Sequence, residues 1–154
     1  MKVVELMTRA VVSVRAHDSL GAAARLMWDH DCGAVPVLDD ADRVVGMLTD
    51  RDICMATWSR DRSPWQIQAS EAMSRELFHC SPNDTIAAVE NLLREKQLRR
   101  MPVLDHKGEL VGILSLADIA RRGNQAALSG PNTDHVTATL ASICRPQAHA
   151  GKSA

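Results

Sequence analysis

Two stretches of the sequence each place a hydroxyl side chain three residues before an aspartate, directly after an apolar run that contains a glycine. Thr49 precedes Asp52 in one stretch, and Ser115 precedes Asp118 in the other. If each hydroxyl stands where a helix begins, its aspartate lies one turn later on the same side. Free N–H groups at a helix start favour phosphate, and a carboxylate beside them can accept ribose hydroxyls. The two pairs therefore suit a nucleoside phosphate.

The same spacing also has a purely structural interpretation. A Thr or Ser N-cap followed three residues later by a carboxylate is the pattern of a capping box, in which each side chain bonds the other residue's backbone N–H. Taken alone, each pair is explained more simply as a helix cap. The choice between cap and binding site depends on the rest of the sequence.

The chain repeats itself with an offset of 66 residues. The segment Pro36-Val37-Leu38-Asp39 matches Pro102-Val103-Leu104-Asp105, and Val45-Gly46-Met47-Leu48 matches Val111-Gly112-Ile113-Leu114. Self-similarity of this kind marks a duplicated structural unit. We expect the two units to pack about a pseudo-twofold axis, so that any cleft on the axis occurs twice and is lined by both halves.

Each unit is predicted to fold as strand, helix, strand, strand and helix, which places the chain in the α/β (α+β) class. The first unit has predicted strands at 11–14, 34–38 and 44–48, with helices that follow Ser19 and Thr49. The second has predicted strands at 77–80, 100–104 and 110–114, with helices at 85–96 and 116–122. We therefore divide the chain into a first repeat at 1–58, a linker at 59–68, a second repeat at 69–122, and a C-terminal extension at 123–154 with one short helix at 133–143.

Composition narrows the classes of function. The 154 residues carry 18 basic and 19 acidic side chains, for a net charge of −1, and only 3% of them are aromatic. Low net charge and few aromatic platforms argue against nucleic-acid binding. No apolar run reaches the roughly 20 residues of a membrane span, and residues 1–9 lack the apolar core of a signal peptide. We expect a cytoplasmic protein without membrane contact.

The four cysteines include no Cys-x-x-Cys pair, and reduced thiols are expected in the cytoplasm. His30 lies near Cys32 and His79 precedes Cys80, but a zinc site needs about four converging ligands, so no metal is assigned. The sequence holds no Gly-x-Ser-x-Gly, Walker or His-Glu-x-x-His motif. These observations argue against an enzyme.

The doubled pattern resembles a pair of cystathionine-β-synthase (CBS) domains, a Bateman module, over about residues 1–122. The resemblance rests on the strand that contains Pro-h-h-Asp, on the Gly-h-h-[Thr/Ser]-x-x-Asp junction, and on the doubling. The chain is similar to small stand-alone bacterial members, and the segments 46–53, 99–103 and 141–146 resemble those linked to hypoxia and stress. This resemblance implies that the two units pack through their sheets with helices outside, leaving two clefts.

The resemblance also implies an adenine nucleotide, AMP, ADP or ATP, in these clefts. Each aspartate would hold a ribose, and basic residues before the strand proline of one unit would reach the phosphates held by the other unit. Two arginines precede the second proline and none precedes the first, so we expect one strong and one weak site. The stronger site is expected to comprise Val12, Ala34, Val35, Pro36, Thr49, Arg51, Asp52, Arg99 and Arg100, and the weaker one Phe78, His79, Cys80, Met101, Pro102, Ser115 and Asp118.

Modules of this family regulate other domains or partners. We expect an energy sensor in which the nucleotide changes a homodimer or acts on an unidentified protein target. The dimer contact is expected on the second helix of each repeat, with Leu116, Ile119, Arg121 and Arg122 as candidates. The alternative is a ligand-free interaction protein of the stress response that binds metal through Cys and His.

Overall fold

The fold is taken from a computed structural model that describes residues 1–127, with side chains described up to Arg121. The helix predicted at 133–143 and most of the C-terminal extension lie outside this part of the chain.

The first repeat contains one three-stranded sheet and two helices. The strands are β1 (Val14–Arg15), β2 (Ala34–Leu38) and β3 (Val44–Thr49), in the order β1-β2-β3, with β1 parallel and β3 antiparallel to β2. The helices are α1 (Leu20–Asp29), capped by the Ser19 hydroxyl, and α2 (Asp50–Arg60), capped by Thr49. The order of elements agrees with the sequence prediction.

The second repeat has the same order but only two assigned strands. It comprises α4 (Ile86–Lys96), β4 (Arg100–Leu104), β5 (Leu110–Ser115) and α5 (Leu116–Ala127), with β4 and β5 antiparallel. Thr85, predicted as the first residue of this helix, is its N-cap. The strand predicted at 77–80 is wrong except at its last residue, because only Cys80 pairs with β4, through a single parallel bridge to Val103.

The first strand of each repeat is short for a shared reason. In the first repeat the Arg15 N–H donates to the Asp18 carboxylate at 2.7 Å, and in the second the Ser81 N–H donates to Asp84 at 2.8 Å. Each bond begins the turn into the next helix, so the backbone cannot continue along the sheet. The strand predicted at 11–14 is found at Val14–Arg15, so only Val14 of the predicted range belongs to it.

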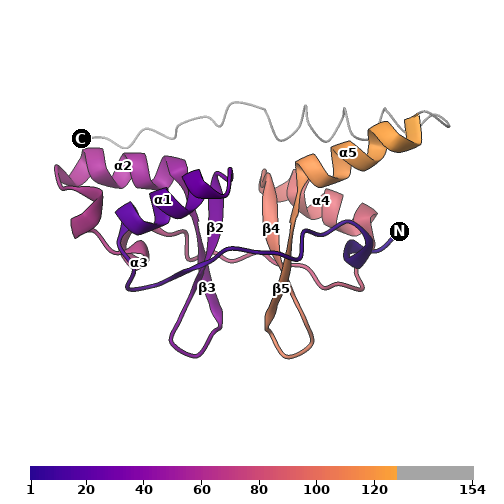
Figure 1. Cartoon of the computed structure of the whole chain (residues 1–154). Helices are drawn as coiled ribbons and strands as arrows, with labels where there is room; N and C mark the ends of the chain where they lie inside the picture. The colour runs from indigo at the N-terminus through magenta and orange to yellow at the C-terminus, as the bar shows by residue number, and fades with distance from the viewer. Residues whose placement is uncertain (128–154) are drawn as a thin grey trace.

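The two sheets stand next to each other in the middle of the molecule, and the helices cover their outer sides (Figure 1). The hairpin turns of both repeats lie at the same end, where Arg43 forms an antiparallel bridge with Glu109. These two residues are 66 positions apart, so the bridge falls on the pseudo-twofold axis that the repeat predicts.

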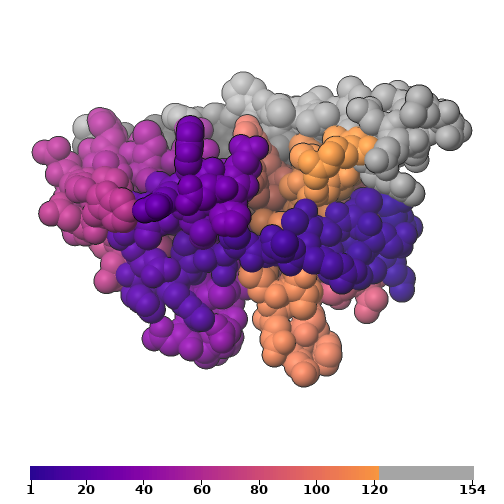
Figure 2. Space-filling model, in the orientation of Figure 1, coloured from indigo at the N-terminus to yellow at the C-terminus, as the bar shows by residue number. Residues whose placement is uncertain are grey.

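Two separate hydrophobic clusters form the core, and each is completed by the start of the other repeat. Val3 and Met7 pack in the cluster of α4, β4, β5 and α5, whereas Ile67 and Ala69 pack in the cluster of α1, β2, β3 and α2. Figure 2 shows the N-terminal segment in indigo running across the face of the molecule from one repeat to the other. The two repeats therefore exchange their first segments.

Backbone hydrogen bonds fix both exchanged segments. Thr8 and Ile113 bond each other in both directions at 2.9 Å, and Met47 and Ser74 do so at 3.1 and 2.9 Å. The four residues form two pairs related by the 66-residue offset. The exchange is thus a symmetric feature of the fold: the segment that contains Thr8 is bonded to β5, and the segment that contains Ser74 is bonded to β3.

The segment predicted as a linker is folded. Helix α2 continues to Arg60, a 3₁₀ turn η2 (Pro64–Gln66) follows, and a short helix α3 (Ala69–Ala72) comes next. Arg60 donates to the Glu71 carboxylate at 2.6 Å and to the Glu71 carbonyl at 2.8 Å. Ile67 between them is fully buried, so this segment contributes to the core as well as joining the repeats.

Within residues 1–127, the model contains no helix of the length and apolar character that a membrane span requires.

Candidate functional site

Thr49 and Asp52 form a complete capping box at the start of α2. Asp52 Oδ2 accepts hydrogen bonds from the Thr49 N–H at 2.9 Å and from the Thr49 hydroxyl at 2.7 Å, and the Asp52 N–H donates to that hydroxyl at 3.1 Å. The two bonds to the carboxylate therefore use one oxygen. The motif therefore forms the helix cap that its spacing predicts. The other carboxylate oxygen, Asp52 Oδ1, is not part of this cap.

Ser115 and Asp118 repeat this geometry at the start of α5. The Ser115 N–H and hydroxyl donate to Asp118 Oδ2 at 2.8 and 2.5 Å, and the Asp118 N–H donates to the hydroxyl at 3.2 Å. Asp118 is only 7% exposed and is the one buried charged residue among those described. Its other oxygen, Oδ1, accepts a hydrogen bond from Nη2 of Arg121.

A cleft of about 280 Å³ opens beside Asp118 and is lined by both repeats. The first repeat supplies apolar side chains of the N-terminal segment and β2, together with the residues that follow α1. The second repeat supplies β4, β5 and the first turns of α5. The lining residues are Thr8, Ala10, Val11, Val12, His30, Asp31, Cys32, Ala34, Arg100, Ile113, Ser115, Asp118 and Arg121.

The cleft combines residues that the sequence analysis assigned to different sites. Val12 and Ala34, expected beside Asp52, lie with Ser115 and Asp118 instead. Arg100 was also expected at the Asp52 site and lines this cleft. Asp118 thus shares its cleft with residues of the first repeat, including Ala34 of β2.

The offset of 66 residues identifies the corresponding positions around Asp52. Phe78 takes the place of Val12, Lys96 that of His30, Arg100 that of Ala34, and Met55 that of Arg121. The Lys96 ammonium lies 5.3 Å from the centre of the Phe78 ring, so these two residues are neighbours in the structure. Phe78, expected in the Asp118 site, is therefore the counterpart of a residue that faces Asp118.

The remaining expected residues are either in the core or at the surface. Val35 and Met101 are fully buried in the two core clusters, and Pro36, Pro102 and Cys80 are buried as well. Arg51, His79 and Arg99 are exposed. None of these eight residues lines the Asp118 cleft.

Arg121 was missed as a site residue, although the sequence contained a signal for it. It stands three residues after Asp118, the spacing at which helical side chains pair, and it lines the cleft with Arg100. The Asp118 cleft therefore carries two guanidinium groups. Both come from the second repeat, so the expectation that this site receives no arginine from the first repeat is unchanged.

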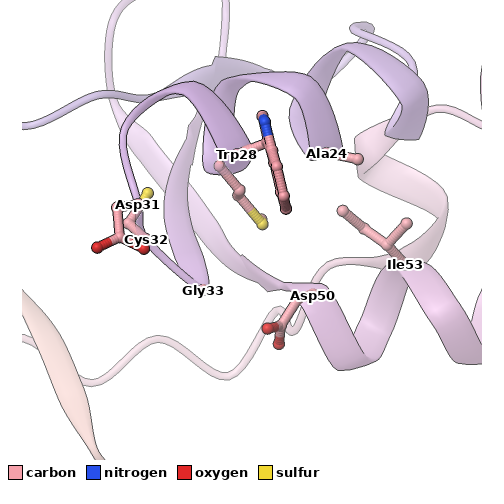
Figure 3. A pocket seen from close by; sticks show the side chains of 8 residues that line it. Ala24, Trp28, Asp31, Cys32, Gly33, Asp50 and Ile53 are labelled. Carbon is pink, nitrogen blue, oxygen red and sulfur yellow. The ribbon is translucent and has the colours of Figure 1, made fainter.

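A second pocket of about 370 Å³ adjoins the cleft (Figure 3). It lies between the end of α1 and the start of α2, with Trp28 and Ile53 on its apolar sides and Asp50 at its rim. Asp31 and Cys32 line both the pocket and the cleft. The loop after α1 is thus the wall between them.

The cysteines do not form a reactive centre in the described residues. Burial and, to a smaller extent, the Asp84 carboxylate raise the pKa of the Cys80 thiol to about 12, so this thiol stays protonated at neutral pH. Cys32 is half-buried and Cys54 is exposed, and neither is in a disulfide. Within the described residues no group of three or more His, Cys, Asp or Glu side chains is arranged to hold a metal ion.

The prediction that four residues of α5 form a dimer contact is wrong for two of them. Leu116 and Ile119 are buried in the core of the second repeat and cannot meet another chain. Arg121 faces the cleft, and the Arg122 side chain lies outside the described part. Among the residues whose side chains are described, the large exposed apolar side chains of the α-helices are on the first repeat instead, where Trp28 is 86%, Trp58 75% and Met55 47% exposed.

Comparison with known proteins adds independent information. The sequence model of the CBS-domain family matches residues 3–58 and 69–124. Hypoxic response protein 1 of Mycobacterium tuberculosis is 36% identical over 145 residues, which cover 94% of this chain and 94% of that protein. The CBS domain-containing protein YhcV of Bacillus subtilis is 39% identical over 116 residues, or 75% of this chain and 81% of that protein.

Solved structures share the fold. The crystal structure of Hypoxic Response Protein I with two coordinated zinc ions has a TM-score of 0.72 and 38% identity, and covers 79% of this chain and 98% of that one. The structure of CBSX2 in complex with AMP has a TM-score of 0.70 and 24% identity, and the match covers 82% of this chain and 98% of that one. The CBS domain pair of MJ0100 in complex with 5′-methylthioadenosine and S-adenosylmethionine has a TM-score of 0.74 and 21% identity. The match covers 81% of this chain and 97% of that one.

The family assignment rests on the duplicated strand-helix-strand-strand-helix unit, on the two aspartates that take part in helix caps, and on these matches. The chain belongs to the CBS-domain family and carries two CBS domains in tandem.

Proposed function

We propose that the chain is a regulatory module that binds an adenine nucleotide, such as AMP or ATP, in the Asp118 cleft. The observation that carries this proposal is the composition of the cleft. One buried carboxylate, a hydroxyl, apolar side chains and two arginines converge on a space of about 280 Å³. A small polar ligand with one flat apolar part and one anionic part matches that set of groups.

Each part of a nucleotide has a suitable partner there. Asp118 is an acceptor for ribose hydroxyls, and Val12, Ala34 and Ile113 provide apolar contact for a base. Arg100 and Arg121 can donate to phosphate oxygens, for which the planar guanidinium is well suited. The sequence analysis favoured Asp52 as the stronger site, and we now propose Asp118 because both arginines line its cleft.

Two structures with the same fold support an adenosyl ligand. The CBSX2 structure is a complex with AMP, and the MJ0100 structure is a complex with 5′-methylthioadenosine and S-adenosylmethionine. These ligands share adenine and a ribose but differ at the 5′ position. The adenosine part is therefore what we carry over to this chain, and the number of phosphates is decided by the arginines of its own cleft.

We further propose that binding acts on a partner instead of on a reaction. The cleft lies between the repeats, so a ligand that contacts both would favour one relative arrangement of them, to the extent that it binds that arrangement better. The partner is a second copy of this chain or an unidentified protein of the cytoplasm. For a homodimer, the second helix α2 offers Met55 and Trp58 as its exposed apolar residues.

The test is calorimetric titration of nucleotide-stripped protein with AMP, ADP and ATP, after the ultraviolet absorbance of freshly purified protein has been recorded. We expect micromolar dissociation constants for at least one nucleotide, with about one site per chain. Folded protein that gives no heat with any of the three would contradict the proposal.

A second candidate function is metal binding, because the similar Hypoxic Response Protein I was crystallised with two zinc ions. The residues described here do not fit a zinc site, since they contain no suitable group of three ligands. Elemental analysis of the purified full chain tests this alternative. Stoichiometric zinc would favour it, and it would direct attention to ligands beyond residue 127.

A further inference from the structure

Both oxygens of the Asp118 carboxylate have a partner within the protein. Oδ2 takes part in the capping box with Ser115, at 2.8 Å from its N–H and 2.5 Å from its hydroxyl. Oδ1 accepts from Nη2 of Arg121, which lies one turn further along α5. Because Oδ2 already accepts two hydrogen bonds in the helix cap, a ribose would bind Asp118 through Oδ1, the oxygen at which Arg121 is already the donor.

The related carboxylate does not have this competitor. Asp52 makes the same bonds to Thr49 through Oδ2. The position that corresponds to Arg121 is Met55, which carries no charge, and the described residues give Asp52 no ion pair. The two aspartates thus differ in one side chain, although their caps are alike.

Arg121 is placed so that it can change partner. Its side chain is 71% exposed, whereas that of Asp118 is 6% exposed. The guanidinium stays hydrated when it leaves Asp118, and a ribose hydroxyl that donates to Oδ1 takes its place, so the buried carboxylate keeps a hydrogen-bond partner during the exchange. Arg121 also lines the cleft together with Arg100, so a phosphate there lies within the region that its long stem can reach.

We infer that Arg121 selects phosphorylated ligands by exchanging the Asp118 carboxylate for a phosphate. The inference rests on the proposed function and specifies which ligands the cleft prefers. A nucleoside displaces Arg121 from Oδ1 and offers it no new acceptor. A nucleotide displaces it in the same way but gives the guanidinium a phosphate oxygen, with which it forms a charge-assisted hydrogen bond. Arg121 therefore weakens nucleoside binding and strengthens nucleotide binding.

The experiment compares adenosine with AMP and ATP on the full chain, by calorimetry or by competition with a fluorescent nucleotide. In Arg121→Ala we expect adenosine to bind at least about threefold tighter and AMP about tenfold weaker, the size of effect that one charge-assisted bond provides. Arg121→Lys keeps the charge without the planar fork, so its AMP affinity should fall between those of the wild type and Arg121→Ala. Arg25→Ala is the matched control, because Arg25 also pairs with an aspartate of its own helix, Asp29, but does not line the cleft, and neither affinity should change by more than about twofold.

The opposite signs separate this inference from a structural role of Arg121. If Arg121→Ala changes both affinities in the same direction, or changes neither, while the wild type binds AMP, the inference is overturned and the proposed function stands. If the wild type binds none of the ligands, the proposed function and the inference about Arg121 are both wrong. Thermal unfolding of each variant shows whether it is folded, and Arg121→Gln is the replacement if the alanine variant is not.

Discussion

Gly46 on β3 lies directly against the carbonyl oxygen of Ser74, in the segment that begins the second repeat. A Cβ placed on Gly46 would be 2.6 Å from that oxygen and 2.8 Å from the sulfur of Met73. Its counterpart Gly112 has the same relationship to Met7 and Thr8, at 2.7 Å and 3.2 Å. The glycine of each sequence motif is therefore required by the exchanged segment of the other repeat.

Replacing Gly46 with alanine should destabilise the fold, because the nearest obstacle is backbone that is itself hydrogen-bonded to Met47. We expect the free energy of unfolding to fall by about 2–3 kcal/mol, the typical cost of overpacking a tight contact. Urea denaturation measures this change. Gly33→Ala is the control, since its Cβ would meet only the movable Asp50 side chain at 3.1 Å and should cost about 0.5 kcal/mol or less. Equal effects of the two substitutions would contradict the account.

Ile67 tests whether the segment between the repeats is part of the core. It is fully buried in the cluster of the first repeat, with Leu20 and Leu48. Ile67→Ala should lower the free energy of unfolding by about 2–4 kcal/mol, as expected for a buried side chain of this size. The neighbouring exposed Gln66→Ala should change it by less than about 0.5 kcal/mol. A small loss for Ile67→Ala would mean that the segment is only a connection.

Cysteine reactivity should follow burial. Cys54 is exposed, whereas burial raises the pKa of Cys80 to about 12. At pH 8 an alkylating reagent should modify Cys54 rapidly and Cys80 only when the protein unfolds, which mass spectrometry of labelled peptides can follow. Modification of Cys80 at a rate close to that of Cys54 in the folded protein would be inconsistent with this structure.

The same pKa shift gives a prediction for alkaline pH. The folded state keeps the Cys80 proton above the ordinary value of 9.0, whereas the unfolded chain releases it there. The stabilisation is therefore fully present below pH 9.0 and is lost as the pH rises from 9.0 towards about 12. Cys80→Ala should show a shallower decline in unfolding free energy over this interval than the wild type.

The exposed apolar side chains of the first repeat test the proposed dimer. Replacing Met55 and Trp58 together with glutamate places two charges on the outer side of α2. Analytical ultracentrifugation should then show monomers where the wild type shows dimers, because a charge buried at an apolar contact is costly. A monomeric wild type, or a variant that remains dimeric, would rule out this contact surface.

Much of the fold could be predicted from the sequence, because the repeat, the helix caps and the apolar alternation are local signals. Thr49 caps α2 as expected, α1 follows Ser19, and the strands that contain Pro36 and Pro102 lie where the pattern places them. The exchange of first segments was not predicted. Periodicity shows that Val3 and Ile67 are apolar but not which of two similar cores receives them.

The candidate site was predicted in its residue types but not in its grouping. Asp118, Val12, Ala34 and Arg100 were all named from the sequence, yet the structure brings them into one cleft and not two. Which strand faces which aspartate depends on how the sheets meet at the axis, and no local pattern records that. Arg121 escaped notice because its spacing from Asp118 indicates a helical pair and gives no sign of a cleft.

The location of nucleotide binding is the most direct test of the account. We would titrate nucleotide-stripped wild type, Asp118→Asn and Asp52→Asn with AMP and ATP, since asparagine keeps the shape of the side chain and removes its charge. The account predicts that Asp118→Asn weakens binding about tenfold or more, as expected when a charged hydrogen-bond acceptor is lost, and that Asp52→Asn weakens it far less. Binding that is lost in Asp52→Asn and retained in Asp118→Asn would contradict it.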